Sequence, residues 1–247
     1  MKFALQETPG EELTRKQQQF NAAMALYDSG KSYRLFGNMV AVVNVSLQFY
    51  LAYRVMSFSI GIVPQIVAFI AAFLITDFLN GLIHMYMDQK EDYASLAGPL
   101  IANFHLHHKT PRYRRNSWPV VYFNESGSEV WLVGYLFAVL LLFEMPGVSA
   151  ILLYILVYVG ILSSVAEVSH YLCHSSNSAL ALFLAGSGLL LRKRHHAQHH
   201  VQDNTHYAFL NGITDPLINR IARKYSRGYK NHTDRHYARY IGADTDR

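Results

Sequence analysis

Four long apolar segments constrain the fold of this chain most strongly, because a helix needs about 20 mostly apolar residues to cross ~30 Å of hydrocarbon. The segments are residues 37–53, 64–83, 128–145 and 148–172. A fifth segment, residues 179–191, is too short to span and contains two glycines, so we expect a re-entrant or interfacial helix there. The sequence therefore predicts an all-α integral membrane protein with about four transmembrane helices.

The composition is typical of a chain that lipid partly solvates. Charged residues make up 16% of the 247 residues, against about 25% in an ordinary soluble domain, and hydrophobic residues make up 51%. This balance excludes a disordered protein, which has few apolar residues and many charges, and argues against a soluble enzyme. The single cysteine excludes a disulfide scaffold, a cysteine-ligated zinc ribbon and an iron–sulfur cluster, because each needs several thiolates.

Basic residues predict the orientation of the chain in the membrane. Lysine and arginine are abundant before the first segment, between the second and third, and after the fourth, whereas the other two connections contain only Arg54. By the positive-inside rule, the N-terminus, the middle segment and the C-terminus face the cytoplasm. We expect a cytoplasmic N-terminal part at residues 1–36, with a surface helix around 14–27 and no secretory signal peptide, a membrane domain at 37–221 and a basic cytoplasmic tail at 222–247. Anionic headgroups account for the net charge of +5, so we expect no nucleic-acid partner.

Thirteen histidines, all between His84 and His236, are the most unusual feature of the composition. On the predicted topology all of them lie on the cytoplasmic side. This is an independent result, because the topology is predicted from hydropathy and from lysine and arginine, without histidine. Scattered structural histidines would have no reason to avoid both outer connections. We therefore expect one metal site at this membrane face, with candidate ligands His84, His107, His108, His170, His174, His195, His196, His199, His200 and His206. His232 and His236, in the basic tail, are expected to be ordinary surface residues.

The spacing of these histidines places several of them on shared helix faces. His170 and His174 are four residues apart and are neighbours on one face. In the run from His195 to His200, steps of about 100° per residue place four rings within about 140° of arc. Imidazole suits iron, zinc, copper and nickel. Because eight or nine convergent histidines exceed what one metal binds, we expect two iron ions; the alternative is one structural zinc with spare surface histidines.

One stripe of the second apolar segment is polar and consists of Asp77, Asn80, Gly81, His84 and Asp88. An ionisable residue at membrane depth is costly and marks a functional site by default. We expect Asp77 to accept the second ring N–H of a ligating histidine, which would fix the orientation of that ring. Asp88 and Glu167 are expected to support the ligands in the same way. The alternative for Asp77 and Glu167 is a carboxylate that only packs helices together.

These motifs resemble the Kua/CarF-type lipid desaturases, which include plasmanylethanolamine desaturase and the plant plastid desaturase that forms a trans double bond in palmitate. The resemblance covers about residues 75–221. An aspartate, a Gly-Leu-x-His motif and a second aspartate of the family match Asp77, Gly81 to His84, and Asp88. The F-x-x-HH-x-x-P, H-x3-H and HH-x2-HH motifs and a final aromatic and Asn-Gly element match Phe104 to Pro111, His170 to His174, His195 to His200, and Thr205 to Gly212. His105 lies where relatives commonly have other residues, so it receives no ligand role.

The resemblance implies a membrane-bound di-iron oxidoreductase that uses O2 to remove two hydrogens from adjacent carbons of a lipid chain. Asn116-Ser117-Trp118 replaces an Arg-His-Asp-Phe run of many relatives, so an alkyl chain, which would give a vinyl-ether or plasmalogen-type product, and an acyl chain both stay open as substrates. Two other functions also stay open. They are a di-iron lipid hydroxylase and, from a different class, a membrane metal transporter.

An external electron donor is a further consequence of the resemblance. The sequence has no flavin-type glycine motif and no haem-binding segment. We therefore expect a small electron-transfer protein of the cytochrome b5 or ferredoxin type as a partner. Its predicted docking site is a basic surface that contains Arg112, Arg114, Arg115 and residues 192–194.

Overall fold

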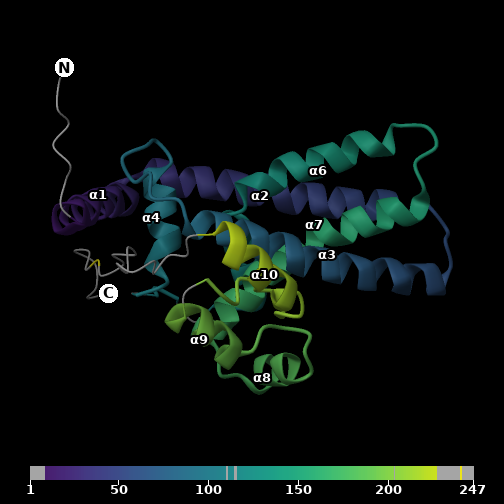
Figure 1. Ribbon diagram of the computed structural model, residues 1–247. Coiled ribbons are helices and arrows are strands. Elements are labelled where there is room, and N and C mark those ends of the chain that lie inside the picture. The colour runs from purple at the N-terminus through teal and green to yellow at the C-terminus, as the bar shows by residue number, and fades with distance from the viewer. Residues whose placement is uncertain (1–8, 110, 114–115, 203, 227–239, 241–247) are drawn as a thin grey trace.

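The computed structural model describes residues 9–109, 111–113, 116–202, 204–226 and 240. These residues contain helices and no strand, so the all-α prediction is confirmed for them. The helices are α1 (Pro9–Ser29), α2 (Lys31–Val55), α3 (Ile62–Asp88), α4 (Gly98–Leu106), α5 (Trp118–Ser126), α6 (Val130–Phe143), α7 (Ala150–Ser175), α8 (Ala179–Gly186), α9 (Lys193–Val201) and α10 (Asp215–Tyr225). Helices α2, α3, α6 and α7 run side by side as a bundle, α1 and α4 lie at one end of it, and α8 to α10 form a lobe against its side (Figure 1).

Three helices are long and apolar enough to cross a membrane, namely α2, α3 and α7. The third predicted span differs from the prediction, because α6 has 14 residues and is about 21 Å long, which is shorter than the hydrocarbon core. It can contribute a span only together with α5, from which it is bent by 86°. The described residues therefore contain three candidate spans, or four if α5 and α6 count as one broken span. At the break, a Cβ atom on Gly127 would lie 2.6 Å from the carbonyl oxygen of Gly37, so only glycine allows α5 and α2 to approach this closely.

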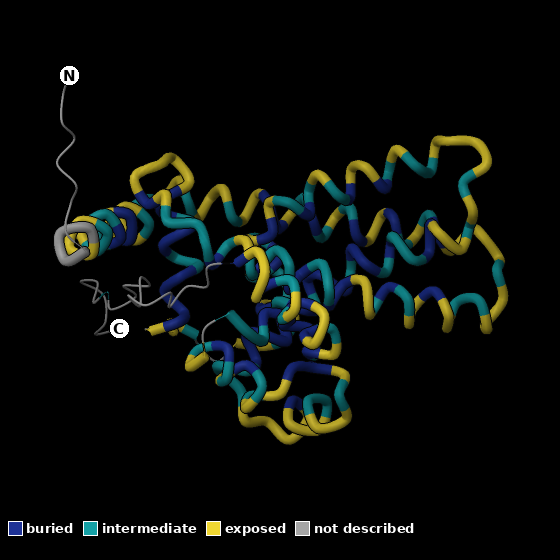
Figure 2. The backbone as a smooth tube through the Cα atoms, viewed as in Figure 1, coloured by how far each residue is buried: buried dark blue, intermediate teal, exposed yellow. Residues whose placement is uncertain are grey.

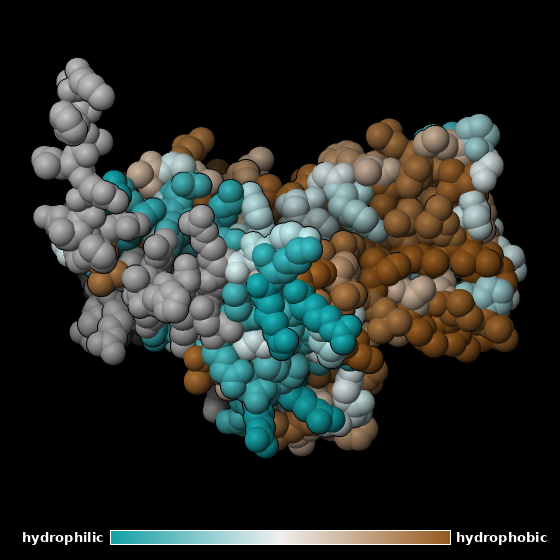
Figure 3. Space-filling view, in the orientation of Figure 1, coloured by the Kyte–Doolittle hydropathy of each residue, from teal (hydrophilic) through white to brown (hydrophobic). Residues whose placement is uncertain are grey.

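The outer surface of the bundle is apolar. Exposed side chains on it include Phe49, Ile66, Ile70 and Leu141, and Figure 3 shows hydrophobic side chains, in brown, over most of the visible face of the bundle. The inner faces are buried (Figure 2), and they pack Leu51, Leu132, Leu136, Leu153 and Val157 into one core. An apolar exterior around an apolar core is typical of helices that lipid surrounds. The chain therefore has the features of a multi-pass membrane protein.

The fifth apolar segment forms α8, which has only eight residues. The hydroxyl of Ser178 accepts a hydrogen bond from the backbone N–H of Ala181 and caps its start. Leu180 and Phe183 on this helix are exposed. As predicted, the segment is too short to span a membrane, and it lies in the lobe beside the bundle (Figure 1).

Helix α1 departs from the prediction of a helix that only lies on the surface. Phe20 and Met24 are fully buried, and they pack against Tyr93, Ala102 and Leu106 on and before α4. The apolar face of α1 is therefore covered by protein. Helix α4 leads directly into the loop that carries the candidate ligands His107 and His108. By packing against α4, α1 therefore supports the position of that loop. The predicted basic tail lies mostly outside the described residues, as do His232 and His236.

Candidate metal centre

Helix α3 supplies the polar stripe that the sequence predicts. Asp77, Asn80, Gly81, His84 and Asp88 are all buried, because this face of α3 packs against α7 and α10. His84 and Asp88 are one turn apart and near the end of the helix, where the loop after α4 and helix α9 also arrive. Four separate parts of the chain thus bring their histidines to the same end of the bundle.

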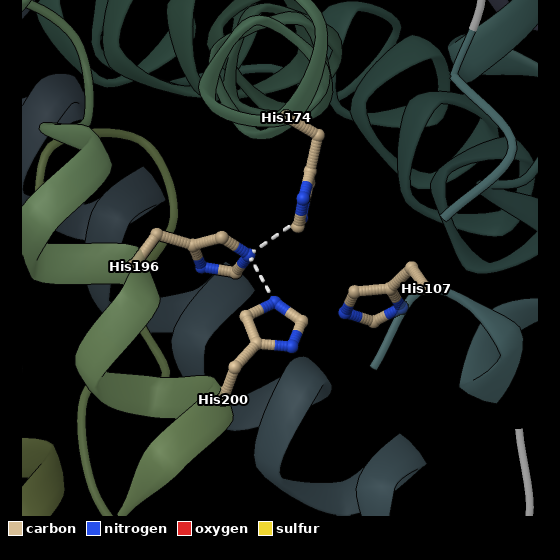
Figure 4. Close-up of side chains that lie close together, drawn as sticks. All are labelled: His107, His174, His196 and His200. Carbon is tan, nitrogen blue, oxygen red and sulfur yellow. Dashed lines mark hydrogen bonds between the residues drawn. The ribbon is translucent and has the colours of Figure 1, made fainter. Parts of the chain in front are cut away.

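The first ligand group consists of four imidazoles, His107, His174, His196 and His200 (Figure 4). They come from the loop after α4, from α7 and from α9, and one ring nitrogen of each lies within 4.8 Å of those of the others. His196 is at the centre, because its Nε2 lies 2.9 Å from Nε2 of His174 and 2.9 Å from Nε2 of His200. His170 adds a further contact, with its Nε2 3.0 Å from the same atom of His196.

These short nitrogen–nitrogen distances carry chemical information. A neutral imidazole nitrogen can either donate one proton or accept one, so His196 Nε2 cannot form good hydrogen bonds with three other Nε2 atoms at once. Two nitrogens that bind one metal at about 2.1 Å and at right angles lie about 3.0 Å apart. The observed distances of 2.9–3.0 Å therefore match the spacing that ligands of one metal ion would have.

The second ligand group consists of His84, Asp88, His108 and His199. The carboxylate of Asp88 is at its centre. Asp88 Oδ1 lies 3.0 Å from His108 Nε2 and 3.7 Å from His84 Nε2, and Oδ2 lies 3.3 Å from His199 Nε2. All four residues are buried, and the side chain of Asp88 is 0% exposed. The sequence predicts a supporting role for Asp88, whereas the structure places its carboxylate among the candidate ligand atoms, because the i,i+4 spacing from His84 puts both on one helix face.

Backbone carbonyls set the direction of three of the histidines. His84 Nδ1 donates to the carbonyl of Tyr207 at 2.8 Å, His199 Nδ1 donates to that of Thr205 at 3.0 Å, and His107 Nδ1 donates to that of Phe104. Because a carbonyl can only accept, each ring carries its proton on Nδ1 and presents the lone pair of Nε2. His84 Nε2 and His107 Nε2 are buried and make no hydrogen bond to the described residues. This is the arrangement that metal-binding histidines have.

Burial also keeps the imidazoles of the loop and of α9 neutral. Desolvation lowers the pKa of His107 and of His196 well below the usual value, and it lowers the pKa of His200 to about 2. The neighbouring histidines lower the pKa of all three further, because positive charges would repel each other. A neutral imidazole is the form that binds a metal.

Together, the donor sets fit two transition-metal ions. The groups adjoin each other, since the ring centroids of His107 and His108 are 4.2 Å apart and those of His199 and His200 are 5.5 Å apart. Each group offers four nitrogen or oxygen donors, of the kinds that bind iron and other first-row transition metals. The short Nε2 distances and the buried Nε2 atoms without hydrogen bonds are the observations on which this fit rests.

Three predicted ligands lie outside both groups: His170, which contacts His196, and His195 and His206. The ring nitrogen Nε2 of His195 is hydrogen-bonded to Asp215, and its ring packs against His206, with centroids 4.5 Å apart. His206 Nδ1 interacts with the hydroxyl of Thr205. His195 is at the edge of the predicted arc on α9, so its ring faces the loop before α10 while His196, His199 and His200 face the two groups.

Asp77 has different partners from those predicted. Within the described part of the chain, its hydrogen bonds go to no histidine; its carboxylate accepts the backbone N–H groups of Asn211, Gly212 and Thr214. Glu167 is predicted to support a ligating histidine, and one of its carboxylate oxygens lies 3.9 Å from Nδ1 of the predicted ligand His170. His105, which receives no ligand role from the sequence, has both ring nitrogens engaged, one with the hydroxyl of Tyr93 and one with the carbonyl of Met87.

Sequence reasoning missed two buried acids. Asp215 bridges His195 and the backbone N–H of Ala208, and Glu129 is 2% exposed and accepts a hydrogen bond from Ser164. Glu129 lies at the break between α5 and α6, next to the predicted start of the third apolar segment. The carbonyls of Thr205 and Tyr207 were also missed, since backbone groups leave no signal in the side-chain pattern.

The fold and the site define a helical membrane protein that gathers two groups of potential metal ligands at one end of its bundle. A family model described as the lipid desaturase domain matches residues 73–224, which is more than half of the chain. The chain therefore belongs to the lipid desaturase domain family, and the predicted resemblance to the Kua/CarF-type family is confirmed. No curated protein and no solved structure was found to match it. Membership of the lipid desaturase domain family supports an oxidoreductase activity of the lipid desaturase type.

Proposed function

We propose that this protein is an O2-dependent di-iron desaturase that forms a carbon–carbon double bond in an alkyl or acyl chain of a membrane lipid. The observation that carries the proposal is the pair of adjacent ligand groups at the ends of α3 and α7. These two helices have apolar outer surfaces that lipid would cover. A lipid substrate in the same membrane therefore has a short path to the site.

The residues of each group would hold one iron ion. His107, His174, His196 and His200 would hold the first, and His84, Asp88, His108 and His199 would hold the second. His170 borders the first group through its contact with His196. When bound, the two ions would supply the activation of O2 and the removal of two hydrogens from the lipid chain.

Aromatic rings around the imidazoles would keep water out. Phe209 packs against His84 and His170, with ring centroids 5.4 Å and 5.6 Å apart. Phe104 covers His84 and His107 from another side, at 5.6 Å and 5.3 Å. Exclusion of water protects reactive species from side reactions, and apolar rings are suitable neighbours for a hydrocarbon chain. These residues would orient the chosen carbons toward the two groups.

A cytoplasmic location of the site is part of the proposal, because the connections on this side are rich in lysine and arginine. There a small donor of the cytochrome b5 or ferredoxin type would deliver electrons. Two of the basic residues predicted for its docking have partners within the chain: Arg112 pairs with Asp28 at 2.8 Å, and Arg192 donates to two carbonyls at the end of α8. Arg114 and Arg115 lie outside the described residues.

A lipid hydroxylase with the same metals is the second candidate, because hydroxylation and desaturation share the first removal of hydrogen. A metal transporter is less compatible with the geometry. Transporters place ligands along a path near the middle of the membrane, and the predicted deep residue, Asp77, is bonded to backbone N–H groups of a loop.

Lipid analysis tests the proposal. In a strain that lacks the gene, the substrate should accumulate, and expression of the full chain should convert it into a species lighter by about 2 Da, the mass of two hydrogens. Expression of the His196→Ala variant should not convert the substrate, since His196 is the centre of the first group. Mild acid would then separate a vinyl ether, which it cleaves, from a double bond in an ester-linked chain. A product that has gained an oxygen atom, with all double bonds unchanged, would overturn the desaturase and favour the hydroxylase.

A further inference from the structure

The loop of residues 205–214 lies between α9 and α10 and contacts the second ligand group through its backbone. Its carbonyls at Thr205 and Tyr207 accept the Nδ1–H groups of His199 and His84. Both histidines belong to the second group. The first group has no equivalent from this loop among the described contacts, because His107 donates to Phe104. One loop thus sets the direction of two ligands of one group.

Asp77 anchors the far end of this loop to α3. Its Oδ1 accepts the backbone N–H groups of Asn211 at 2.9 Å and Gly212 at 3.1 Å, and its Oδ2 accepts the N–H and the hydroxyl of Thr214 at 2.9 Å and 2.7 Å. The side chain is fully buried. Four donors to one buried carboxylate form a charge-assisted network, and all of them come from within four residues of the loop.

Asp215 and Ser169 hold the middle of the loop. Asp215 Oδ1 accepts the backbone N–H of Ala208 at 2.9 Å, while its Oδ2 accepts from His195. Ser169 on α7 donates to the carbonyl of Leu210 at 2.8 Å. The N–H of Ala208 and the carbonyl of Tyr207 belong to the same peptide group, so Asp215 fixes the peptide whose carbonyl accepts from His84.

Two glycines allow the loop to lie this close. A Cβ atom on Gly81 of α3 would be 3.1 Å from the backbone nitrogen of Ala208, and one on Gly212 would be 2.5 Å from Nε2 of His195. Gly212 also has φ +84°, a conformation that favours glycine. The loop is therefore held on α3 by hydrogen bonds; Gly81 lets it lie close to α3, and Gly212 lets it lie close to His195 of α9.

We propose that residues 205–214 are a clamp that fixes the tautomer and direction of His84 and His199, and that Asp77 and Asp215 are positioning residues that hold this clamp. The inference rests on the proposed two-metal centre. Its consequence is selective: loss of the clamp weakens the metal site of the second group and leaves the first group intact. Asp77 acts on the metal through the loop, without touching a ligand.

Metal analysis of the full-length protein tests the clamp. The variant Asp77→Asn keeps the shape of the side chain but turns an amide N–H2 toward two of the four donors. We expect about two iron ions per wild-type chain and about one per Asp77→Asn chain, because the loss of a partner that orients a ligand lowers metal affinity by about 10- to 100-fold. Thr76→Val is the matched control, since Thr76 is the neighbouring buried residue and its hydroxyl makes no hydrogen bond to the described residues. This control variant should retain two iron ions per chain.

Double variants identify which site is weakened. In the Asp77→Asn background, His199→Ala should cause no further loss of iron, whereas His200→Ala should remove the iron that remains. Thr214→Val, which loses only the hydroxyl bond to Asp77, tests the same idea with a smaller change and should lower the affinity for one iron only. Two irons bound with wild-type affinity in both Asp77→Asn and Thr214→Val would overturn the clamp, as would equal weakening of both sites in Thr214→Val.

A second measurement needs no metal. In metal-free protein with 15N-labelled histidine, the ring shifts of His84 and His199 should report protons on Nδ1 in the wild type and a mixture of tautomers in Thr214→Val and Asp77→Asn. Unchanged tautomers in both variants would contradict the clamp. If the wild type binds no iron, the proposed function fails, and the ring shifts still decide whether the loop sets the tautomers.

Discussion

His199 and His200 are consecutive residues of α9, yet they face different ligand groups: His199 Nε2 lies 3.3 Å from Asp88 Oδ2, and His200 Nε2 lies 2.9 Å from His196 Nε2. His107 and His108 divide between the groups in the same way. On a helix, consecutive side chains point about 100° apart, so a pair of adjacent histidines can contribute to two metals that lie side by side. The doubled histidines His107-His108 and His199-His200 therefore each contribute to both groups, whereas His195 of the pair His195-His196 belongs to neither.

The first prediction concerns these pairs. His199→Ala and His200→Ala should each lower product formation by at least about 100-fold, since loss of a ligand should cost at least as much as loss of a residue that orients one. Each variant should retain about one iron per chain. His232→Ala, in the tail, is the control and should behave as the wild type. Normal product formation by either ligand variant would contradict the assignment of that histidine.

Asp88 gives a second prediction, because the structure places its carboxylate between three imidazoles. Asp88→Asn should lower the iron content to about one per chain, since a neutral amide does not balance the charge of a cation as a carboxylate does. Iron analysis and product formation can be measured on the same preparation. If Asp88→Asn kept two irons and normal activity, Asp88 would only support the histidines, as the sequence predicts.

The polar stripe of α3 and the facing histidines of α7 could be predicted from the sequence, because helical periodicity fixes which side chains share a face. The positions of α2, α3 and α7 could also be predicted, since hydropathy depends only on local composition. The bend of 86° between α5 and α6 could not, because it depends on how closely Gly127 approaches Gly37. That approach is a tertiary contact with no local signal.

The partners of Asp77 and the place of His195 show a second limit. The sequence correctly indicates that Asp77 is buried, but its donors are backbone N–H groups more than 130 residues away. Spacing on α9 places His195 with its neighbours, whereas Asp215 draws its ring toward the loop. Patterns of side chains thus predict which residues gather, and long-range backbone contacts decide which of them can bind a metal.

A third prediction uses the close packing at Gly81. In Gly81→Ala the new methyl group would meet the backbone of Ala208 at 3.1 Å and the side chain of Ile218 at 2.4 Å, so we expect a loss of about 1–3 kcal/mol in the free energy of unfolding. Gly134→Ala on α6 is a matched control, because nothing lies within 4 Å of the position of its new Cβ atom. It should be neutral or stabilising. Thermal unfolding in detergent compares the two variants, and equal effects would contradict the close contact.

A fourth prediction concerns orientation. Single cysteines at Ser32, Ser59, Ser95 and Asn231, introduced after replacement of Cys173, should be tested with a reagent that does not cross the membrane. Only the cysteine at position 59, in the connection between α2 and α3, should be labelled from outside, because that connection contains few basic residues. Asn231 lies outside the described residues. External labelling at position 95 would place the loop with His107 and His108 on the wrong side for the proposed electron donor.

The central claim is that the two ligand groups each hold one iron ion. Elemental analysis of the full-length protein, purified from iron-replete cells, tests it most directly when combined with Mössbauer spectroscopy. The account predicts about two iron atoms per chain, in two environments that differ because one group contains the carboxylate of Asp88 and the other contains only imidazoles. One zinc atom per chain and no iron would contradict it.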